Sequence, residues 1–253
     1  MKKYILLIAS LIIATTALPK KRILFMGDSI TDGGWGNSGG SMMASSERNH
    51  TDMNHIYGHS YMMLCASQLE SEFPGDFEFF NRGISGDDIW RMAKRWKEDV
   101  LDLQPDVLSL LVGTNDVHYY LDNQIGKGNS TDTFNIDAWE KEYRNLLTEC
   151  RLQNPKIKII LGKPFTAKVG YVGKRADYDI RKNILSEMAK RIDNIGEDFS
   201  AVVLDYPILF DSLQKEHTQV ETSYWIWDGI HPTPAGHRRM ADLWLKTFAS
   251  INE

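Results

Sequence analysis

The chain has 253 residues, of which 42% are hydrophobic, and its formal net charge is −5 at pH 7. It has no basic run of the kind that binds polyanions, so we expect no nucleic-acid partner. It also has no internal repeat and no long Pro, Ser or Gln tract. These features predict one globular domain with a sizeable core, which we place at residues 18–253.

The first 17 residues resemble a secretory signal peptide. Lys2 and Lys3 precede an apolar stretch at residues 4–13, and Thr15 and Ala17 are small residues suited to a cleavage site. A membrane anchor would need about 20 apolar residues, more than this stretch supplies. We therefore predict a signal peptide at residues 1–17, a secreted or periplasmic protein, and no stable membrane insertion after its removal.

The first predicted strand ends close to a serine. Residues 23–26 form a short apolar run bounded by Arg22 and Gly27, as expected for a strand covered on both faces. Ser29 follows the carboxyl end of this strand, and α/β sheets bind ligands at that edge. Its hydroxyl is a candidate nucleophile. An ordinary turn is the alternative interpretation of this stretch taken alone.

Residues 32–57 form the least regular part of the sequence, and five glycines lie between Gly33 and Gly40. This composition predicts a long loop, and such loops are commonly binding segments or disordered. Residues 36–40 match the Gly-x-Ser-x-Gly nucleophile elbow around Ser38, but that motif requires a strand before it and a helix after it. We therefore do not assign Ser38 a catalytic role.

Strands and helices alternate along the rest of the chain. Strands are predicted at 77–80, 107–112, 156–161 and 201–205, and helices at 58–73, 87–103, 136–150, 176–195 and 234–248. Thr233 and Pro234 are suited to the N-cap and the first position of the last helix. The alternation predicts an α/β fold with a parallel sheet of about five strands, helices on both faces and right-handed crossovers.

Three loops of this predicted sheet open on the same edge. They carry Ser29, Gly83 and Asn115, which follow the first, second and third strands. Gly and Asn also serve plain turns. If the loops converge, the backbone N–H groups of Ser29 and Gly83 and the Asn115 amide would stabilise the oxyanion formed when a serine attacks an ester.

A carboxylate and an imidazole lie three residues apart near the carboxyl end of the chain. In Asp228-Gly229-Ile230-His231, Asp228 is close enough to hold one ring nitrogen of His231 while the other nitrogen faces a serine hydroxyl. His231 is therefore a candidate general base. A surface histidine before a helix is the alternative.

Four segments together resemble the four sequence blocks of the SGNH (GDSL-type) hydrolase family, in the same order. They are residues 27–31, 81–86, 113–116 and 228–232. The resemblance covers residues 21–248 and implies a flavodoxin-like three-layer α/β/α fold, ester or thioester hydrolysis, and no metal or cofactor. It also implies that Ser29 is the nucleophile, His231 the base and Asp228 its orienting acid. By the same resemblance, Ser29, Gly83 and Asn115 form the oxyanion hole.

Two further sets of side chains have less specific patterns. His50, His55 and His59 have no cysteine or carboxylate cluster at ligand spacing, so we predict no metal site. Cys65 and Cys150 lie on the apolar sides of predicted helices. We interpret them as buried free thiols, although an exported protein could pair them.

The substrate is suggested by the residues around the predicted site. Trp225 and Trp227 lie beside Asp228 and are candidates to stack on a sugar ring, with core packing as the alternative. Residues 31–54 are dominated by polar residues and glycine, which suits a hydroxyl-rich alcohol better than a long acyl chain. We expect a serine esterase that removes acetyl groups from carbohydrate. A lipase, lysophospholipase or thioesterase of the same family, and a non-catalytic carbohydrate-binding protein, are the alternatives.

Overall fold

A computed structural model describes residues 19–34, 56–124 and 133–252. All five predicted strands are present and form one parallel sheet with the order β2-β1-β3-β4-β5. The strands are β1 (Lys21–Gly27), β2 (Phe77–Gly83), β3 (Val107–Leu111), β4 (Lys158–Gly162) and β5 (Val202–Leu204).

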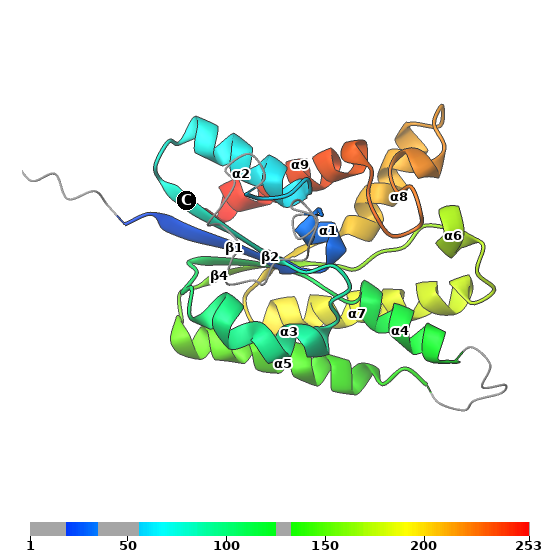
Figure 1. Cartoon of the computed structure of the whole chain (residues 1–253), viewed down its shortest axis with the longest axis horizontal. Helices are drawn as coiled ribbons and strands as arrows, with labels where there is room; N and C mark the ends of the chain where they lie inside the picture. Colours follow the sequence, from blue (N-terminus) through cyan, green and yellow to red (C-terminus); the bar gives the residue numbers. More distant parts are fainter. Residues whose placement is uncertain (1–18, 35–55, 125–132, 253) are drawn as a thin grey trace, which may run out of the picture.

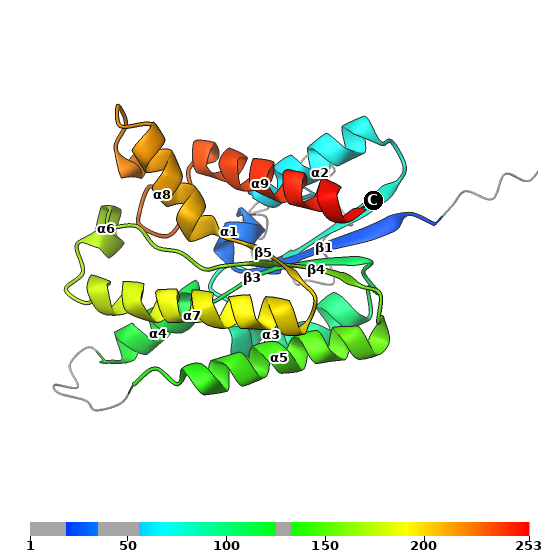
Figure 2. The same cartoon turned by 180° about the vertical axis from the view of Figure 1, so that it is seen from behind.

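Helices cover both faces of the sheet and give the predicted three-layer α/β/α arrangement (Figures 1 and 2). One layer holds α1 (Ser29–Asp32), α2 (Tyr61–Glu72), α8 (Tyr206–Glu216) and α9 (Pro234–Asn252). The other holds α3 (Ile89–Trp96), α4 (Thr114–Gln124), α5 (Ile136–Gln153) and α7 (Tyr178–Asp198). The short α6 (Gly170–Gly173) follows β4, and a π-helical turn (Lys97–Leu101) extends α3.

The apolar run of β1 is continuous because both of its faces are covered. Ile23 and Phe25 contact the layer that contains α9, whereas Leu24 and Met26 contact the opposite layer. All four side chains have no exposed surface. A central parallel strand therefore lacks the alternation that marks a strand with one solvated face.

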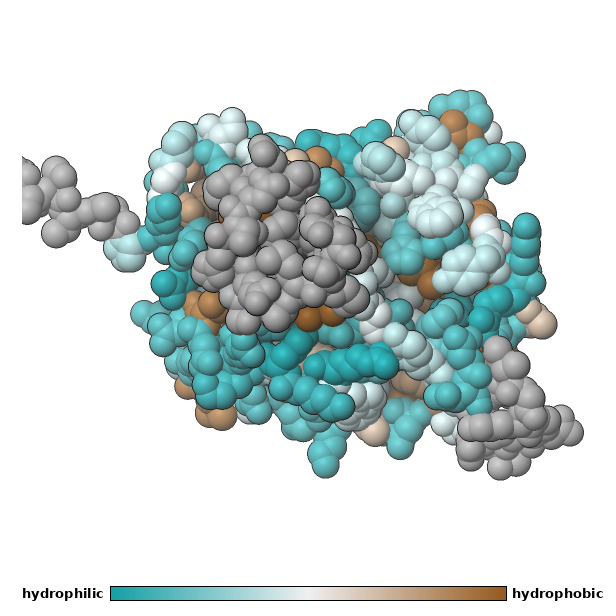
Figure 3. Space-filling view, viewed as in Figure 1, coloured by the Kyte–Doolittle hydropathy of each residue, from teal (hydrophilic) through white to brown (hydrophobic). Residues whose placement is uncertain are grey.

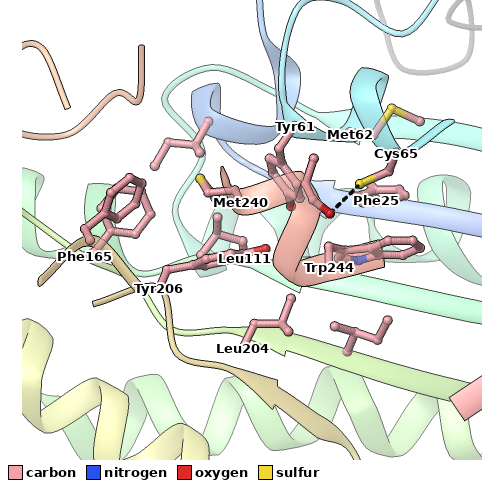
Figure 4. Packing of buried hydrophobic residues seen from close by; sticks show 14 of the residues in the cluster. Phe25, Tyr61, Met62, Cys65, Leu111, Phe165, Leu204, Tyr206, Met240 and Trp244 are labelled. Atoms are coloured by element: carbon pink, nitrogen blue, oxygen red, sulfur yellow. Dashed lines mark hydrogen bonds between the residues drawn. The ribbon is translucent and has the colours of Figure 1, made fainter. Parts of the chain in front are cut away.

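Trp244 fixes α9 to the middle of the sheet (Figure 4). Its ring stacks on Phe248 with centroids 5.0 Å apart and lies 4.8 Å from the ring of Phe25. Its indole Nε1 donates a hydrogen bond to Ser109 Oγ at 3.0 Å. The loop that precedes α9 carries His231, so this packing also limits where that histidine can lie.

The two cysteines lie in different layers. Cys65 packs on the side of α9 and Cys150 on the side of α5, and the sheet separates them. Both are buried and free, which confirms the interpretation as buried thiols and excludes a disulfide between them in this structure.

Four helices were not predicted from the sequence, namely α1, α4, α6 and α8. Helices α1 and α6 have only one turn each. The residues that begin α4 were interpreted as a loop. The start of α8 does carry a recognisable signal, because Asp205 accepts a hydrogen bond from the Ile208 N–H and Pro207 lies in the first turn. The predicted cap of α9 is confirmed, since Thr233 Oγ1 accepts from the Gly236 N–H at 3.2 Å.

Some predictions fall on other parts of the chain. The signal peptide at residues 1–17, Ser38 and most of the loop at 32–57 lie outside the described residues. Among the helices of the described ranges, none combines the length and apolar character needed to cross a bilayer.

The strand order reverses at β1, which has β2 on one side and β3 on the other. Gly27 at the end of β1 is in register with Gly83 and with Leu111, so these three strands end at the same level. In doubly wound sheets a ligand crevice forms at such a switch point, outside the carboxyl ends of the strands. The loops that follow β1, β2 and β3 all meet there.

Candidate active site

Ser29 is the first residue of α1, directly beyond the end of β1. Asp28 caps this turn, because its carboxylate accepts a hydrogen bond from the Ile30 N–H at 2.9 Å. Asp28 is buried, whereas Ser29 is half-buried. The turn therefore presents the serine hydroxyl at the switch point of the sheet.

His231 joins Ser29 to Asp228. The Ser29 Oγ lies 2.8 Å from His231 Nε2, and His231 Nδ1 lies 2.7 Å from Asp228 Oδ2. The Asp228 carboxylate accepts a hydrogen bond from the Nδ1–H group, which leaves Nε2 without a proton and able to accept a hydrogen bond from the Ser29 hydroxyl. The three predicted residues are thus brought together in the arrangement of a serine nucleophile, its base and an orienting acid.

The turn that carries Asp228 and His231 is held from two directions. Asp228 Oδ1 accepts hydrogen bonds from the backbone N–H groups of Ile230 at 2.9 Å and His231 at 2.7 Å. From the segment after β4, the Ala167 N–H donates to the Gly229 carbonyl at 2.9 Å. From α6, the Val172 N–H donates to the Asp228 carbonyl at 3.2 Å. The imidazole is therefore fixed by backbone contacts as well as by its carboxylate.

Asp228 and His231 shift each other's pKa in opposite directions. Burial alone would raise the pKa of the Asp228 carboxyl, but the hydrogen bonds from the His231 ring and from backbone N–H groups lower it overall. The hydrogen bond with Asp228 raises the pKa of His231 above its ordinary value of 6.5. Asp228 is thus a carboxylate at neutral pH, and His231 is a stronger base than a free imidazole.

Asn115, at the start of α4, lies beside the turn that carries Ser29. Its amide Nδ2 donates a hydrogen bond to the Asp87 carbonyl at 3.0 Å and lies 3.5 Å from Asp28 Oδ2. The residue is half-buried. The amide is therefore within the same loop cluster as Ser29, as the sequence predicted.

Gly83 lies in this cluster, but its N–H is already used. It donates to Asn81 Oδ1 at 2.9 Å, and the residue is buried. A Cβ at this position would lie 2.4 Å from the Asp32 nitrogen, so the glycine allows β2 to pack against the end of α1. Close packing of the two backbones is therefore sufficient to explain why glycine occurs here.

Gly86, three residues further on, was not selected from the sequence. It is half-buried and has a φ of +85°, a region that favours glycine. Within the described ranges, the N–H groups of Gly86 and Ser29 donate no hydrogen bond. The sequence signal that could have identified Gly86 is Ser-Gly-Asp at 85–87, in which a glycine occupies a turn just before a helix cap.

Two buried carboxyls near Ser29, those of Asp28 and Asp116, were not identified from the sequence. Burial raises the pKa of Asp28 to about 6, and it raises the pKa of Asp116 to about 7. Asp116 accepts a hydrogen bond from the Ile89 N–H at 3.1 Å, which joins α4 to α3. Both carboxyls lie next to predicted site residues in the sequence.

The two tryptophans beside Asp228 have different environments. Trp227 is 60% exposed, whereas Trp225 is 5% exposed and packs against Tyr224 and His217. The proposed sugar contact at Trp225 is therefore not supported, and the core alternative holds for it. Tyr171 of α6 is 50% exposed, and the nearby Asp228 carboxylate helps partial burial to raise its pKa. Tyr171 and Trp227, which is next to Asp228 in the sequence, are thus two accessible rings.

The visible surface of the described residues is mixed in character. In the described part of the face shown in Figure 3, hydrophobic side chains form small separate areas among hydrophilic and intermediate ones. Within the same described ranges, no cluster of three or more His, Cys, Asp or Glu residues has the geometry to hold a metal. His59 is exposed, and His50 and His55 lie outside these ranges.

Comparison with known proteins gives consistent matches. The model of the GDSL-like lipase/acylhydrolase family matches residues 25–239. An acetylxylan esterase of Geobacillus stearothermophilus is 27% identical over 228 residues, which cover 89% of this chain and 93% of that protein. A solved structure of an acetylxylan esterase from the same organism has a TM-score of 0.69 at 26% identity, with the same coverage of the two chains.

A solved structure named as a GDSL-like lipase, from Parabacteroides merdae, has a TM-score of 0.74 at 29% identity. The match covers 91% of this chain and 97% of that one. The family match spans most of the sequence and includes Ser29 and His231. The chain therefore belongs to the GDSL-like lipase/acylhydrolase family.

Proposed function

We propose that this protein is an exported serine esterase that releases short acyl groups, above all acetate, from carbohydrate. Its family makes it an ester-hydrolysing enzyme. The observation that carries the proposed mechanism is the pair of hydrogen bonds that join Ser29 Oγ to His231 Nε2 at 2.8 Å and His231 Nδ1 to Asp228 Oδ2 at 2.7 Å.

The reaction follows from these contacts. Ser29 Oγ attacks the ester carbonyl carbon while its proton passes to His231 Nε2. Collapse of the tetrahedral intermediate breaks the bond to the alcohol, which leaves with the proton from His231. A water molecule, deprotonated by the same imidazole, then attacks the acyl-serine. Collapse of the second intermediate breaks the bond to Ser29 Oγ, which takes the proton back from His231, and the carboxylic acid is released. Asp228 holds the ring and stabilises the imidazolium in both steps.

The oxyanion needs hydrogen-bond donors that are free before substrate binds. The Ser29 N–H meets this condition. The Asn115 amide carries two N–H donors, and it donates to the Asp87 carbonyl at 3.0 Å but makes only a long contact of 3.5 Å with Asp28 Oδ2. We propose that the second of these N–H groups turns to the oxyanion. We propose Gly86 in place of Gly83 as the third donor, because the Gly83 N–H already bonds to Asn81 whereas the Gly86 N–H has no acceptor in the described ranges.

An acetylated carbohydrate is the substrate class that the surroundings of the site favour. Trp227, which is next to Asp228 in the sequence, has an exposed ring, and so has Tyr171, which interacts electrostatically with Asp228. Such rings stack on the apolar faces of sugars. A long acyl chain would require a sizeable apolar surface, whereas the hydrophobic areas of the described residues visible in Figure 3 are small and separate. The 27% identity with an acetylxylan esterase supports the same substrate class.

The site of action belongs to the same proposal. The basic and apolar pattern at residues 1–17 supports a cleaved signal peptide, followed by one hydrolase domain at 18–253. Export would bring the enzyme to polymeric glycans outside the cytoplasm. Amino-terminal sequencing of protein exported by a bacterial host should then begin at Leu18.

The role of Ser29 is tested with a serine-to-alanine pair. Ser29→Ala should lower kcat for 4-nitrophenyl acetate by at least about 10,000-fold, because no other group forms the acyl-enzyme. Ser38→Ala, in the elbow-like segment, should keep wild-type activity. Circular dichroism checks that both variants fold. Full activity in folded Ser29→Ala would refute the nucleophile assignment, and an inactive wild type would favour the non-catalytic carbohydrate-binding alternative.

The substrate class is tested by comparing acyl length and alcohol. We expect kcat/KM to fall steeply from 4-nitrophenyl acetate to the C8 ester, and acetate to be released from acetylated xylooligosaccharides. Trp227→Ala should raise KM for the oligosaccharide by about 3- to 10-fold, the range of one aromatic stacking contact, without affecting 4-nitrophenyl acetate. Activity that rises with acyl length, or turnover of phospholipids or thioesters alone, would support the alternatives within the family.

A further inference from the structure

The turn at residues 85–87, which we call the Gly86 turn, is fastened to the helix that carries the nucleophile. The Ser85 N–H and Oγ both donate to Asp32 Oδ2, at 3.2 and 2.6 Å. Asp32 is the last residue of α1, and Ser29 is the first. This pair of hydrogen bonds therefore couples the position of the Gly86 turn to the position of the nucleophile.

Two side chains converge on the Gly86 carbonyl from the other side. Arg91 Nη1 donates to this oxygen at 2.9 Å and Tyr119 Oη donates to it at 2.8 Å. The Arg91 guanidinium also lies over the Tyr119 ring, 4.3 Å from its centroid. Arg91 comes from α3 and Tyr119 from α4, so the carbonyl is held between the helices that follow β2 and β3.

The next carbonyl is held as well, since Asp87 O accepts from Asn115 Nδ2 at 3.0 Å. Tyr119 lies four residues after Asn115 on α4, so one helix supplies both donors. The carbonyls of Gly86 and Asp87 are therefore both engaged, whereas the Gly86 N–H donates to nothing in the described ranges. Because the two carbonyls are held while the Gly86 N–H is unused, the turn can present this N–H to a ligand in a fixed direction.

We propose that Arg91 and Tyr119 are positioning residues for catalysis, which hold the Gly86 carbonyl so that the Gly86 N–H faces the oxyanion. This inference rests on the proposed function, in which Gly86 is an oxyanion donor. Without a Cβ, glycine gains access to several backbone conformations, so its φ of +85° does not by itself keep the N–H in one direction. Two donors on the carbonyl supply that restraint.

Neither side chain is part of the hydrophobic core. The Arg91 side chain is 49% exposed, and Tyr119 is half-buried at the surface of α4. Removal of either donor should therefore leave the melting temperature close to that of the wild type. A loss of activity would then have to come from the orientation of the turn.

The first experiment compares Tyr119→Phe and Arg91→Gln with two matched controls. Tyr143→Phe removes a buried hydroxyl that has no partner in the described ranges, and Lys94→Gln removes an exposed charge from the same helix as Arg91. With 4-nitrophenyl acetate, each test variant should lose on the order of 10-fold in kcat, with KM within about two-fold of wild type. The controls should keep both constants.

The second experiment uses inactivation by diethyl 4-nitrophenyl phosphate, which phosphorylates the serine and develops charge on its phosphoryl oxygen. The rate constant for inactivation should fall in Tyr119→Phe and Arg91→Gln by a factor similar to the loss in kcat. This readout needs no carbohydrate substrate. If wild type is inactivated at Ser29 but releases no acetate from any ester, the proposed substrate is refuted while the positioning role is still measured.

Three results would overturn the inference. The first is wild-type kcat and inactivation rates in both Tyr119→Phe and Arg91→Gln. The second is a change in KM alone, which would make these residues substrate contacts. The third is a loss of activity matched by a fall in melting temperature, which would make the contacts structural.

Discussion

Burial affects the ionisable side chains around Ser29 in different ways, according to the hydrogen bonds that each receives. Asp228 accepts two backbone N–H groups and the His231 ring, and its pKa is lowered. Asp28 and Asp116 receive less compensation for burial, and their pKa values rise to about 6 and about 7. Near neutral pH, Asp228 is therefore the carboxylate that is firmly charged beside the imidazole.

This arrangement predicts how activity depends on pH. His231 must be neutral to accept the proton of Ser29, and its pKa is raised above 6.5. Activity should therefore fall as the pH decreases through that raised pKa, with an acid limb that lies above pH 6.5. Asp228→Asn should move the limb to lower pH and reduce kcat on the order of 1,000- to 10,000-fold. Profiles of kcat/KM against pH for both proteins measure the shift.

The shift in Asp228→Asn assigns the acid limb to His231, because Asp28 and Asp116 also titrate near this pH range but do not bond to Asp228. Two other described histidines have lowered pKa values. Burial lowers the pKa of His237 to about 4, and its Nδ1 accepts a hydrogen bond from the Tyr61 N–H. The pKa of His118 is also lowered, mainly by burial. An Asp228→Asn profile with an unchanged limb would show that His231 is not the group that titrates.

At the scale of elements, α9 connects the core to the site. Trp244 is fully buried against Phe25 and Phe248 and bonds to Ser109, and the loop before this helix carries His231. Trp244→Ala should lower the free energy of unfolding by about 3–5 kcal/mol, because it removes a large buried side chain and leaves a cavity. Urea denaturation followed by circular dichroism measures this change.

Leu152 provides the matched control for that measurement. It lies on α5 and is 78% exposed. Leu152→Ala should change the free energy of unfolding by no more than about 0.5 kcal/mol. If Trp244→Ala were no more destabilising than Leu152→Ala, the role of α9 in holding the core would be wrong.

At the scale of the whole molecule, the sheet divides the interior into two cores. Cys65 belongs to one and Cys150 to the other. Burial raises the pKa of Cys150 to about 12 and raises that of Cys65 well above its ordinary value. Neither thiol is thus available as a thiolate in the folded protein.

Thiol labelling checks this division directly. Ellman's reagent should react with neither cysteine in the native protein and with both after denaturation without reductant. The melting temperature should be the same with and without dithiothreitol, because no disulfide contributes to stability. A single labelled thiol in the native state, or a thermal shift with reductant, would contradict the structure.

The sequence by itself determined the sheet and the chemistry of the proposed nucleophile and base. Strands covered on both faces require continuous apolar runs, such as residues 23–26, and these are visible without a structure. Asp228 and His231 are three residues apart, so their hydrogen bond depends on one local turn. Helix N-caps can also be predicted from the sequence, as Thr233 and Pro234 show at the start of α9.

Only the tertiary structure decided which groups meet and which remain free. Ser29 and His231 are separated by 202 positions, and their contact depends on how α9 docks on the sheet. Trp225 and Trp227 look equivalent in the sequence, but docking buries one and exposes the other. The same holds for Gly83 and Gly86, because a backbone N–H is free or engaged according to which neighbours the fold brings to it, and these neighbours come from distant segments.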